Sequence, residues 1–256
     1  MHVVDVGAGV PLVMLHAFPV DSRMWDGVRD RLAERVRVIT PDQRGFGRSP
    51  LPAGDGPGMD VLADDVVALL DGLGLERVVL GGCSMGGYVA MAVLRKAAER
   101  VDRLVLVDTR PDADDFDRRA GRLAMATRAE EEGTAFLPDA LLPGLLAAGT
   151  PDRRADLVGD VRAMIVAQPA AGVAWALRAM AERPDSHDVL RAFDRPALVV
   201  VGERDALSPP QVAGELAELL PAAELVEVPG VGHLTPVEAP DEVAAGILNW
   251  LGLAAG

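Results

Sequence analysis

Short apolar runs alternate with stretches of helical spacing along most of the chain. The runs are rich in β-branched residues and bounded by Gly or Pro, which is typical of strands buried on both faces of a parallel sheet. They occupy residues 11–15, 36–40, 77–81, 104–108, 197–202 and 225–228. One apolar face recurs at helical spacing in residues 59–73, 84–98, 210–220 and 241–251. Strand alternating with helix predicts the α/β class, with a doubly wound, mostly parallel sheet flanked by helices.

The alternation stops between residues 111 and 187, where the pattern is helical throughout and interrupted by prolines. Connections between strands are normally far shorter than this. We therefore expect an inserted helical cap over one end of the sheet, rather than a pair of ordinary crossover helices. The predicted core is then residues 1–110 and 188–256, and the cap is 111–187. Because few residues precede the first apolar run, we expect the sheet to lack a full first hairpin strand.

A glycine-rich turn joins the third apolar run to the helical stretch that follows. It reads Gly82-Cys83-Ser84-Met85-Gly86. A nucleophile at such a strand-to-helix turn has strained backbone and projects from the chain, and it requires glycines where side chains would collide. The N–H groups at the start of the helix favour developing negative charge. We predict that Ser84 is a nucleophile. A phosphate-binding turn is the weaker interpretation, because the Lys-Ser/Thr pair of a P-loop is absent.

A serine nucleophile needs a base, and the chain has four histidines. His2 lies at the terminus, His16 ends the first apolar run, and His187 lies in a polar stretch. His233 follows the last apolar run in a glycine-rich loop. That loop and the Ser84 turn both come at carboxyl ends of predicted parallel strands, the edge where open α/β sheets bind ligands. We therefore predict that His233 is the base.

The base in turn needs an orienting acid, expected between the serine and the histidine in chain order. Asp205 comes just past the apolar run at residues 197–202 and is the predicted acid. Glu203 is a nearby alternative, and Asp108, at the end of an earlier run, is a distant one.

Acyl transfer also requires donors for an oxyanion. The N–H of Met85, directly after the nucleophile, is one candidate. The N–H of Phe18, in the loop after the first apolar run, is the second, because Pro19 has no N–H. We expect His16 to anchor this loop by hydrogen bonds, and we also include it among candidate substrate contacts.

The helical cap supplies further candidates for contact with a substrate. Trp175, Met125 and Leu142 are predicted to roof an apolar acyl pocket, although each taken singly is more typical of cap core. Arg118, Arg119 and Arg122 have the charge to meet an acidic substrate, but we expect a solvated helix face here.

The ordered set of motifs resembles the α/β-hydrolase fold superfamily over nearly the whole chain. The matching segments are His16-Ala17-Phe18-Pro19, Pro41-Asp42-Gln43-Arg44-Gly45-Phe46-Gly47-Arg48-Ser49, the Ser84 turn, Gly202-Glu203-Arg204-Asp205 and Gly232-His233. The chain looks most like small capped members: carboxylesterases, enol-lactone hydrolases and cofactor-free perhydrolases. The resemblance implies a Ser84-Asp205-His233 triad and a structural role for residues 42–49. The chain departs from the usual family pattern at position 17, where it has Ala17 and the family has glycine. Haloalkane dehalogenases and epoxide hydrolases of this fold carry aspartate at the turn, so the resemblance implies neither activity here.

The chain of 256 residues has 39 acidic and 25 basic side chains, a net charge of −14. Such a field repels nucleic acid and anionic membrane surfaces, so we expect neither as a partner. The acidic excess falls mainly on residues 111–256, which favours a neutral substrate. One cysteine fits a reducing compartment, and the first residues lack the pattern of a signal peptide, so we expect a cytoplasmic location. No Cys/His cluster indicates a metal, and we expect no metal and no organic cofactor.

These observations predict a serine hydrolase that cleaves a carboxylic ester or lactone through an acyl-enzyme on Ser84. Perhydrolase, thioesterase and carbon–carbon bond hydrolase activities use the same triad and stay open. A non-catalytic ligand-binding or regulatory protein is the alternative of another class. The sequence is compatible with a monomer or a homodimer.

Overall fold

The computed structural model describes residues 1–253, which form a seven-stranded sheet in the order β1-β3-β2-β4-β5-β6-β7. β1 pairs antiparallel with β3, and every other neighbouring pair is parallel. The mostly parallel, helix-flanked α/β sheet predicted from the sequence is therefore confirmed. The strands are β1 (Val3–Val6), β2 (Pro11–Leu15), β3 (Arg37–Pro41), β4 (Val78–Cys83), β5 (Val101–Val107), β6 (Ala197–Gly202) and β7 (Ala223–Val228).

A short strand, β1, precedes the first apolar run, but it has four residues and pairs with β3 rather than forming a hairpin with β2. Val4 lies opposite Thr40 of β3, and Arg37 holds Asp5 through two hydrogen bonds of 2.9 and 2.7 Å. The strand lies at the edge of the sheet, and its Asp5 and Val6 are exposed. An edge strand does not need a continuous apolar run, which is why the hydrophobic pattern did not reveal it.

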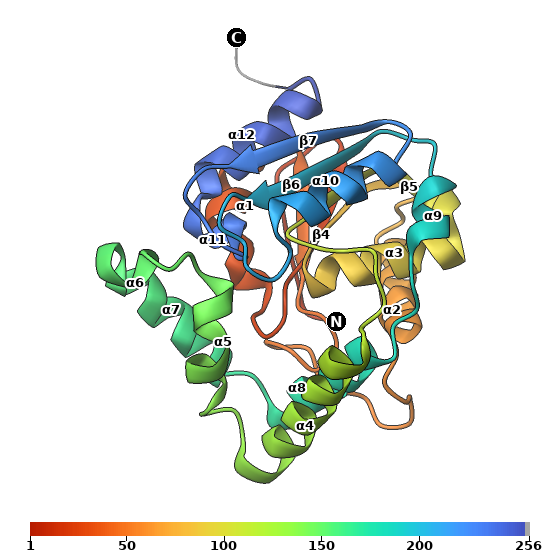
Figure 1. Ribbon diagram of the computed structural model, residues 1–256. Helices are drawn as coiled ribbons and strands as arrows, with labels where there is room; N and C mark the ends of the chain where they lie inside the picture. The colour runs from red at the N-terminus through yellow and green to blue at the C-terminus, as the bar shows by residue number, and fades with distance from the viewer. Residues whose placement is uncertain (254–256) are drawn as a thin grey trace.

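Helices cover both faces of the sheet (Figure 1). On one face, α1 (Asp26–Leu32) packs against α12 (Pro240–Trp250). On the other, α3 (Met85–Ala97) lies over β4, α2 (Met59–Gly72) packs on α3, and α10 (Pro210–Leu219) covers β6 and β7. The short elements are η1 (Ser22–Trp25), η2 (Ala98–Arg100) and α11 (Thr235–Glu238). The central strands are buried on both faces, with Leu80, Leu104 and Leu198 fully inaccessible, as continuous apolar runs require.

The connection from β5 to β6 consists of helices and irregular chain, without a strand in residues 108–196. Its elements are α4 (Phe116–Glu132), α5 (Leu137–Leu145), α6 (Thr150–Arg153), α7 (Ala155–Val166), α8 (Ala170–Ala181) and α9 (His187–Arg191). α4 packs along α8 and α5 along α7, and these helices gather at one end of the sheet (Figure 1). α9 packs instead against α3 of the core. We call α4 to α8 the cap.

Within residues 1–253, no single helix is both long enough and apolar enough to span a membrane. Helices α7 and α8 taken together have the required length and apolar composition, but the two helices are bent by 92° relative to each other.

Candidate active site

Ser84 occupies a sharp turn between β4 and α3. Its φ of 52° and ψ of −111° place it in backbone geometry that a residue with a side chain rarely adopts. The turn is held because the Ser84 N–H donates to Val107 O at 2.9 Å and its carbonyl accepts from the Thr109 hydroxyl at 2.9 Å. The flanking glycines are required sterically, since a Cβ at Gly82 would collide with the backbone of Gly86. This is the strained strand-to-helix turn that the glycine spacing predicts.

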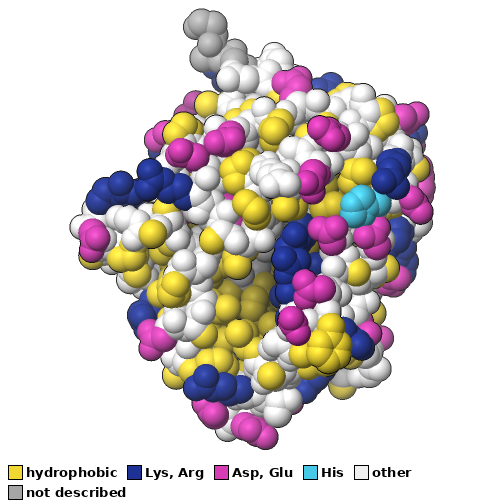
Figure 2. All heavy atoms as spheres, in the orientation of Figure 1, with side chains coloured by type: hydrophobic (Ala, Val, Ile, Leu, Met, Phe, Trp, Pro, Cys, Tyr) yellow, Lys and Arg dark blue, Asp and Glu magenta, His cyan; other side chains and the backbone are white. Residues whose placement is uncertain are grey.

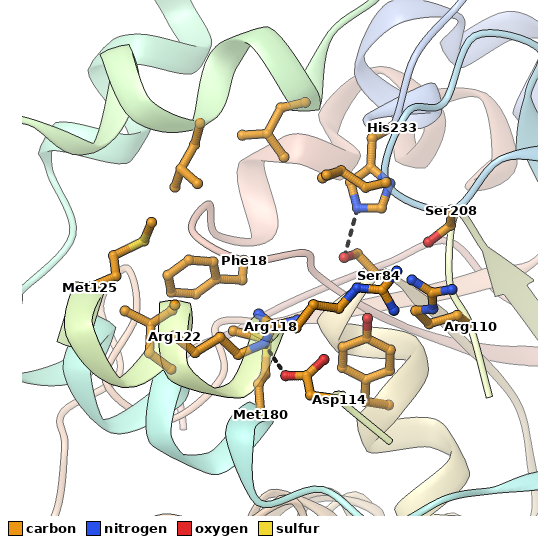
Figure 3. Close-up of a pocket in the computed structure, with 16 residues that line it drawn as sticks. Phe18, Ser84, Arg110, Asp114, Arg118, Arg122, Met125, Met180, Ser208 and His233 are labelled. Carbon is orange, nitrogen blue, oxygen red and sulfur yellow. Dashed lines mark hydrogen bonds and ion pairs between the residues drawn. The ribbon is translucent and has the colours of Figure 1, made fainter. Parts of the chain in front are cut away.

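His233 lies within hydrogen-bonding distance of the serine. Its Nε2 is 2.8 Å from Ser84 Oγ, and its Nδ1 is 2.8 Å from Asp205 Oδ2 (Figure 3). Asp205 is itself oriented, because its Oδ1 accepts hydrogen bonds from the N–H groups of Leu207 and Ser208 at 2.8 and 2.9 Å. Serine, imidazole and carboxylate therefore form one continuous chain of hydrogen bonds. His233 and Asp205 are both almost fully buried, whereas Ser84 is half-buried.

The charges around the imidazole set its basicity. Burial alone would lower the pKa of His233, but the hydrogen bond and the negative charge of Asp205 raise it above the ordinary 6.5. Burial alone would raise the pKa of Asp205, and its hydrogen bond to His233 holds it below 3.8. The pair is thus arranged as a carboxylate beside a strengthened base.

The two alternative acids occupy other positions. Glu203 is exposed and its carboxylate accepts from the Gly230 N–H at 2.6 Å. Asp108 is buried beside the triad, where it accepts hydrogen bonds from the N–H groups of Gly202 and Thr235, both at 3.0 Å. Burial, with the charge of Asp205, raises the pKa of Asp108 to about 8 although His233 acts against the shift. Asp108 therefore braces the loops that carry Asp205 and His233, and Asp205 is the carboxylate in contact with the imidazole.

The loop after β2 reaches the site through Phe18, which lines the same pocket as Ser84 and His233. Within residues 1–253, neither the Phe18 N–H nor the Met85 N–H donates a hydrogen bond to a protein atom. His16 is fully buried in this loop, where its Nδ1 lies 2.9 Å from Ala17 O and its Nε2 accepts from the Gln43 N–H at 2.9 Å. Its ring nitrogens are thus both engaged in anchoring the loop. Burial lowers the pKa of His16, which suits a neutral ring with one donor and one acceptor.

A cavity of about 290 Å³ opens above Ser84, between the core and the cap. Figure 2 shows the hollow with hydrophobic side chains on its floor and a basic patch along one wall. Of the predicted substrate contacts, Met125 lines the cavity. Leu142 does not, although its neighbours Leu141 and Leu145 do. The other apolar lining residues are Phe18, Tyr88, Leu177, Met180 and Leu207.

His16 and Trp175 are not part of this lining. Trp175 is buried, and its Nε1 donates to Asp55 O at 3.2 Å, so it fastens the cap to the core. The pattern of hydrophobic residues on a cap helix indicates which side is buried. It does not distinguish burial against the core from burial against a cavity.

The charged lining was only partly anticipated from the sequence. Arg118 and Arg122 both line the cavity. Arg122 is only partly exposed and departs from the expected solvated face, whereas the Arg118 side chain is 46% exposed and is solvated as expected. Arg119 is exposed and pairs with Glu182, as expected of a solvated position. Arg110 and Asp114, which sequence reasoning missed, also line the cavity. Their place in the chain could have identified them. Both follow the carboxyl end of β5, at the edge of the sheet where the Ser84 turn lies.

The remaining histidines lie away from the triad. His2 lies 3.1 Å from Asp42, and His187 pairs with Asp185 at 2.9 Å. Asp112, Asp185 and His187 together place one potential ligand atom each within 4.8 Å of the others. All three are at least partly exposed, and such exposed acidic groups are common without a metal.

A family model for the alpha/beta hydrolase fold matches residues 10–240 of the chain. A curated protein of Mycobacterium tuberculosis named haloalkane dehalogenase 2 is 31% identical over 98% of this chain and 91% of its own length. A curated 2-hydroxymuconate semialdehyde hydrolase of Pseudomonas sp. is 31% identical over 91% of this chain and 84% of its own.

Solved structures are similar over nearly the whole chain. A thermophilic esterase from Thermogutta terrifontis, with malate bound, has a TM-score of 0.95 and 41% identity over 98% of this chain and 92% of its own. An enol-lactonase from Burkholderia xenovorans has a TM-score of 0.89 and 28% identity over 98% of this chain and 96% of its own.

Proposed function

The chain belongs to the alpha/beta hydrolase fold family, and from that premise we propose that it is a serine hydrolase of carboxylic esters or lactones. The hydrogen-bonded chain from Ser84 Oγ through His233 to Asp205, with 2.8 Å at each step, carries the proposal. The relatives named esterase and enol-lactonase support the choice of acyl transfer.

In the proposed reaction, Ser84 Oγ attacks the carbonyl carbon while His233 Nε2 takes the hydroxyl proton. The carbonyl oxygen becomes an oxyanion that accepts hydrogen bonds from the N–H groups of Phe18 and Met85. Collapse of this intermediate breaks the ester C–O bond, and His233 returns the proton to the leaving alkoxide. An acyl-enzyme on Ser84 remains.

Water completes the proposed cycle by the same route. His233 takes a proton from water, whose oxygen attacks the acyl carbon, and the second tetrahedral intermediate releases the carboxylic acid as Ser84 regains its proton. Asp205 keeps the Nδ1 proton of His233 in place and stabilises the imidazolium that forms twice per turnover.

The relative named haloalkane dehalogenase does not extend that activity to this chain, because of the chemistry of Ser84. Displacement of a halide by a serine hydroxyl would leave an alkyl ether on the protein. An ether has no carbonyl carbon for water to attack, so the enzyme would be trapped after one turnover. We therefore propose turnover of acyl substrates and none of haloalkanes.

The proposal is tested by labelling with a fluorophosphonate probe and by turnover of 4-nitrophenyl acetate. We expect the wild-type protein to label and turn over, and Ser84→Ala to do neither. His233→Ala should lose the burst of acylation, whereas His187→Ala should retain it, because His187 lies in an exposed pair with Asp185. A wild-type protein that neither labels nor hydrolyses the ester would overturn the proposal.

A further inference from the structure

The cavity above Ser84 carries an excess of positive charge in a molecule whose net charge is −14. Three arginines line it, Arg110, Arg118 and Arg122, against a single carboxylate, Asp114. The rest of the lining is mostly apolar. Arg110 is largely buried, with 12% of its side chain exposed, whereas the Arg118 side chain is 46% exposed. The partners of the three arginines show which of them are already neutralised.

Arg122 is committed to Asp114. Its Nε lies 2.5 Å from Asp114 Oδ2, and Arg183 lies 2.7 Å from Oδ1 on the other side. The side chain of Asp114 is fully buried between these two cations. Its negative charge is therefore satisfied within the protein and does not offset the remaining arginines.

Arg110 and Arg118 have weaker partners. Arg110 Nε makes one long hydrogen bond of 3.4 Å to Asp112, and Arg118 Nε lies 3.7 Å from Asp115. Among residues 1–253, the Nη groups of both arginines donate no hydrogen bond to a protein atom. Figure 3 shows Arg118 extending toward Ser84, with Arg110 on the same side of the cavity, whereas Arg122 turns to Asp114. The Arg110 side chain is only 12% exposed, so its free donors face the cavity more than bulk solvent.

Guanidinium groups bind carboxylates through paired, charge-assisted hydrogen bonds, and such bonds are strongest where apolar walls exclude water. We propose that Arg110 and Arg118 form a carboxylate subsite, and that the substrate is an ester or lactone that also carries a free carboxylate. This inference rests on the proposed serine hydrolase function. The carboxylate of the substrate would lie against the arginines while its ester carbonyl lies at Ser84.

The proposed subsite differs from the neutral substrate expected from the distribution of charge along the chain. That expectation placed the acidic excess by chain segment, but the electrostatic potential inside a cavity is governed by the charges that line it. The acidic side chains that dominate the total are mostly on the outer surface, where salt screens them. A carboxylate-bearing substrate is therefore compatible with an acidic protein.

Matched pairs of esters test this inference. The monomethyl esters of succinic, glutaric and adipic acids are compared with the methyl esters of the corresponding monoamides, which have the same shape without the charge. We expect kcat/KM to favour at least one acid over its amide by about tenfold or more, the value of one charge-assisted hydrogen bond. The inference is wrong if the wild-type protein prefers no acid over its amide at any of the three lengths.

Variants then assign the preference to the arginines. Arg110→Gln and Arg118→Gln should each reduce the acid-to-amide ratio of kcat/KM by about tenfold, because each removes charged donors from the subsite. Arg118→Lys should retain part of the ratio, since it keeps the charge without the planar fork. Arg119→Gln is the control, and we expect it to leave the ratio unchanged because Arg119 pairs with Glu182 outside the cavity. A ratio that survives both glutamine variants would also overturn the inference.

Failure of this inference is distinguishable from failure of the proposed function. A protein that hydrolyses 4-nitrophenyl acetate and labels at Ser84, but has no preference for the acids, is a serine hydrolase without this subsite. A protein that does not label at all refutes the function on which the inference depends.

Discussion

The imidazole of His233 shows how single hydrogen bonds decide the chemistry of this site. A buried histidine is normally a poor base, because burial disfavours its protonated form. Here Asp205 accepts from Nδ1 at 2.8 Å and more than compensates, so the pKa of His233 lies above 6.5. The imidazole is then protonated at mildly acidic pH and neutral at higher pH, the form that the proposed mechanism requires.

This balance predicts the pH dependence of hydrolysis. For a neutral ester, kcat/KM should rise as His233 loses its proton, with a midpoint above pH 6.5. Asp205→Asn removes the charge that raises this pKa, so its midpoint should move to lower pH. The same substitution should lower the plateau by about 10³–10⁴-fold, because the wrong imidazole tautomer is favoured. The measurement is kcat/KM against pH for both proteins.

Asp188→Asn is a matched control for that experiment, since Asp188 is exposed and pairs with Arg191 on the surface. It should leave both midpoint and plateau unchanged. An unshifted midpoint in Asp205→Asn would contradict the assignment of Asp205 as the partner of His233.

The elements of the core could be predicted from sequence because burial on both faces imposes continuous apolar runs. Ser84, Asp205 and His233 could be placed at one edge because each follows a predicted strand, and the structure brings the three together. Which cap residues line the cavity could not be predicted in the same way. Trp175 and Leu142 have the pattern of buried helix positions, but that pattern is the same whether a helix packs on a core or on a cavity.

At the scale of elements, the cap helix α8 meets the core at two glycines. A Cβ on Gly172 would overlap the backbone of Gly45 in the loop after β3. Helix α8 can approach that loop this closely only because neither position has a side chain. The same helix carries Leu177 and Met180 to the cavity, so its position also sets the width of the site.

We therefore expect Gly172→Ala to destabilise the protein, although alanine is the better helix former. Displacing α8 to relieve the overlap should cost about 1–3 kcal/mol. Gly159→Ala is the control, because Gly159 in α7 has open space around its Cβ position. That substitution should stabilise the protein by up to about 1 kcal/mol through helix propensity alone. Thermal unfolding of the two variants should thus shift in opposite directions, and equal shifts would contradict this view of the α8 contact.

At the scale of the whole molecule, cap and core are joined at the site itself. The Leu234 N–H, next to His233, donates to Leu145 O of the cap at 2.9 Å. Glu238 accepts from the Gly232 N–H at 2.7 Å and from the Ala147 N–H of the cap. On the opposite side, Arg183 lies 4.2 Å from the ring centre of Tyr88 in core helix α3. The histidine loop and the cap are therefore parts of one packed unit.

The Arg122-Asp114-Arg183 cluster is the charged part of that junction, and its loss should weaken the whole fold. Asp114→Asn leaves two arginines without their counter-charge, which should cost about 3 kcal/mol in the free energy of unfolding. Asp139→Asn should cost almost nothing, because Asp139 is 76% exposed and its pair with Arg162 is on the surface. Urea unfolding at neutral pH measures both, and equal stability of the two variants would contradict the role of the cluster.

The stability difference between wild type and Asp114→Asn should change with pH in one direction only. Burial alone would raise the pKa of Asp114, but Arg122 and Arg183 hold it below 3.8. A carboxyl group whose pKa is lower in the folded protein stabilises the fold above its unfolded pKa and loses that contribution as pH falls through the folded value. The difference between wild type and Asp114→Asn should therefore be constant from neutral pH down to about pH 5 and shrink toward about pH 3. A difference that grows on acidification would mean that Asp114 is protonated in the folded protein, and the ion cluster would then not be what joins cap to core.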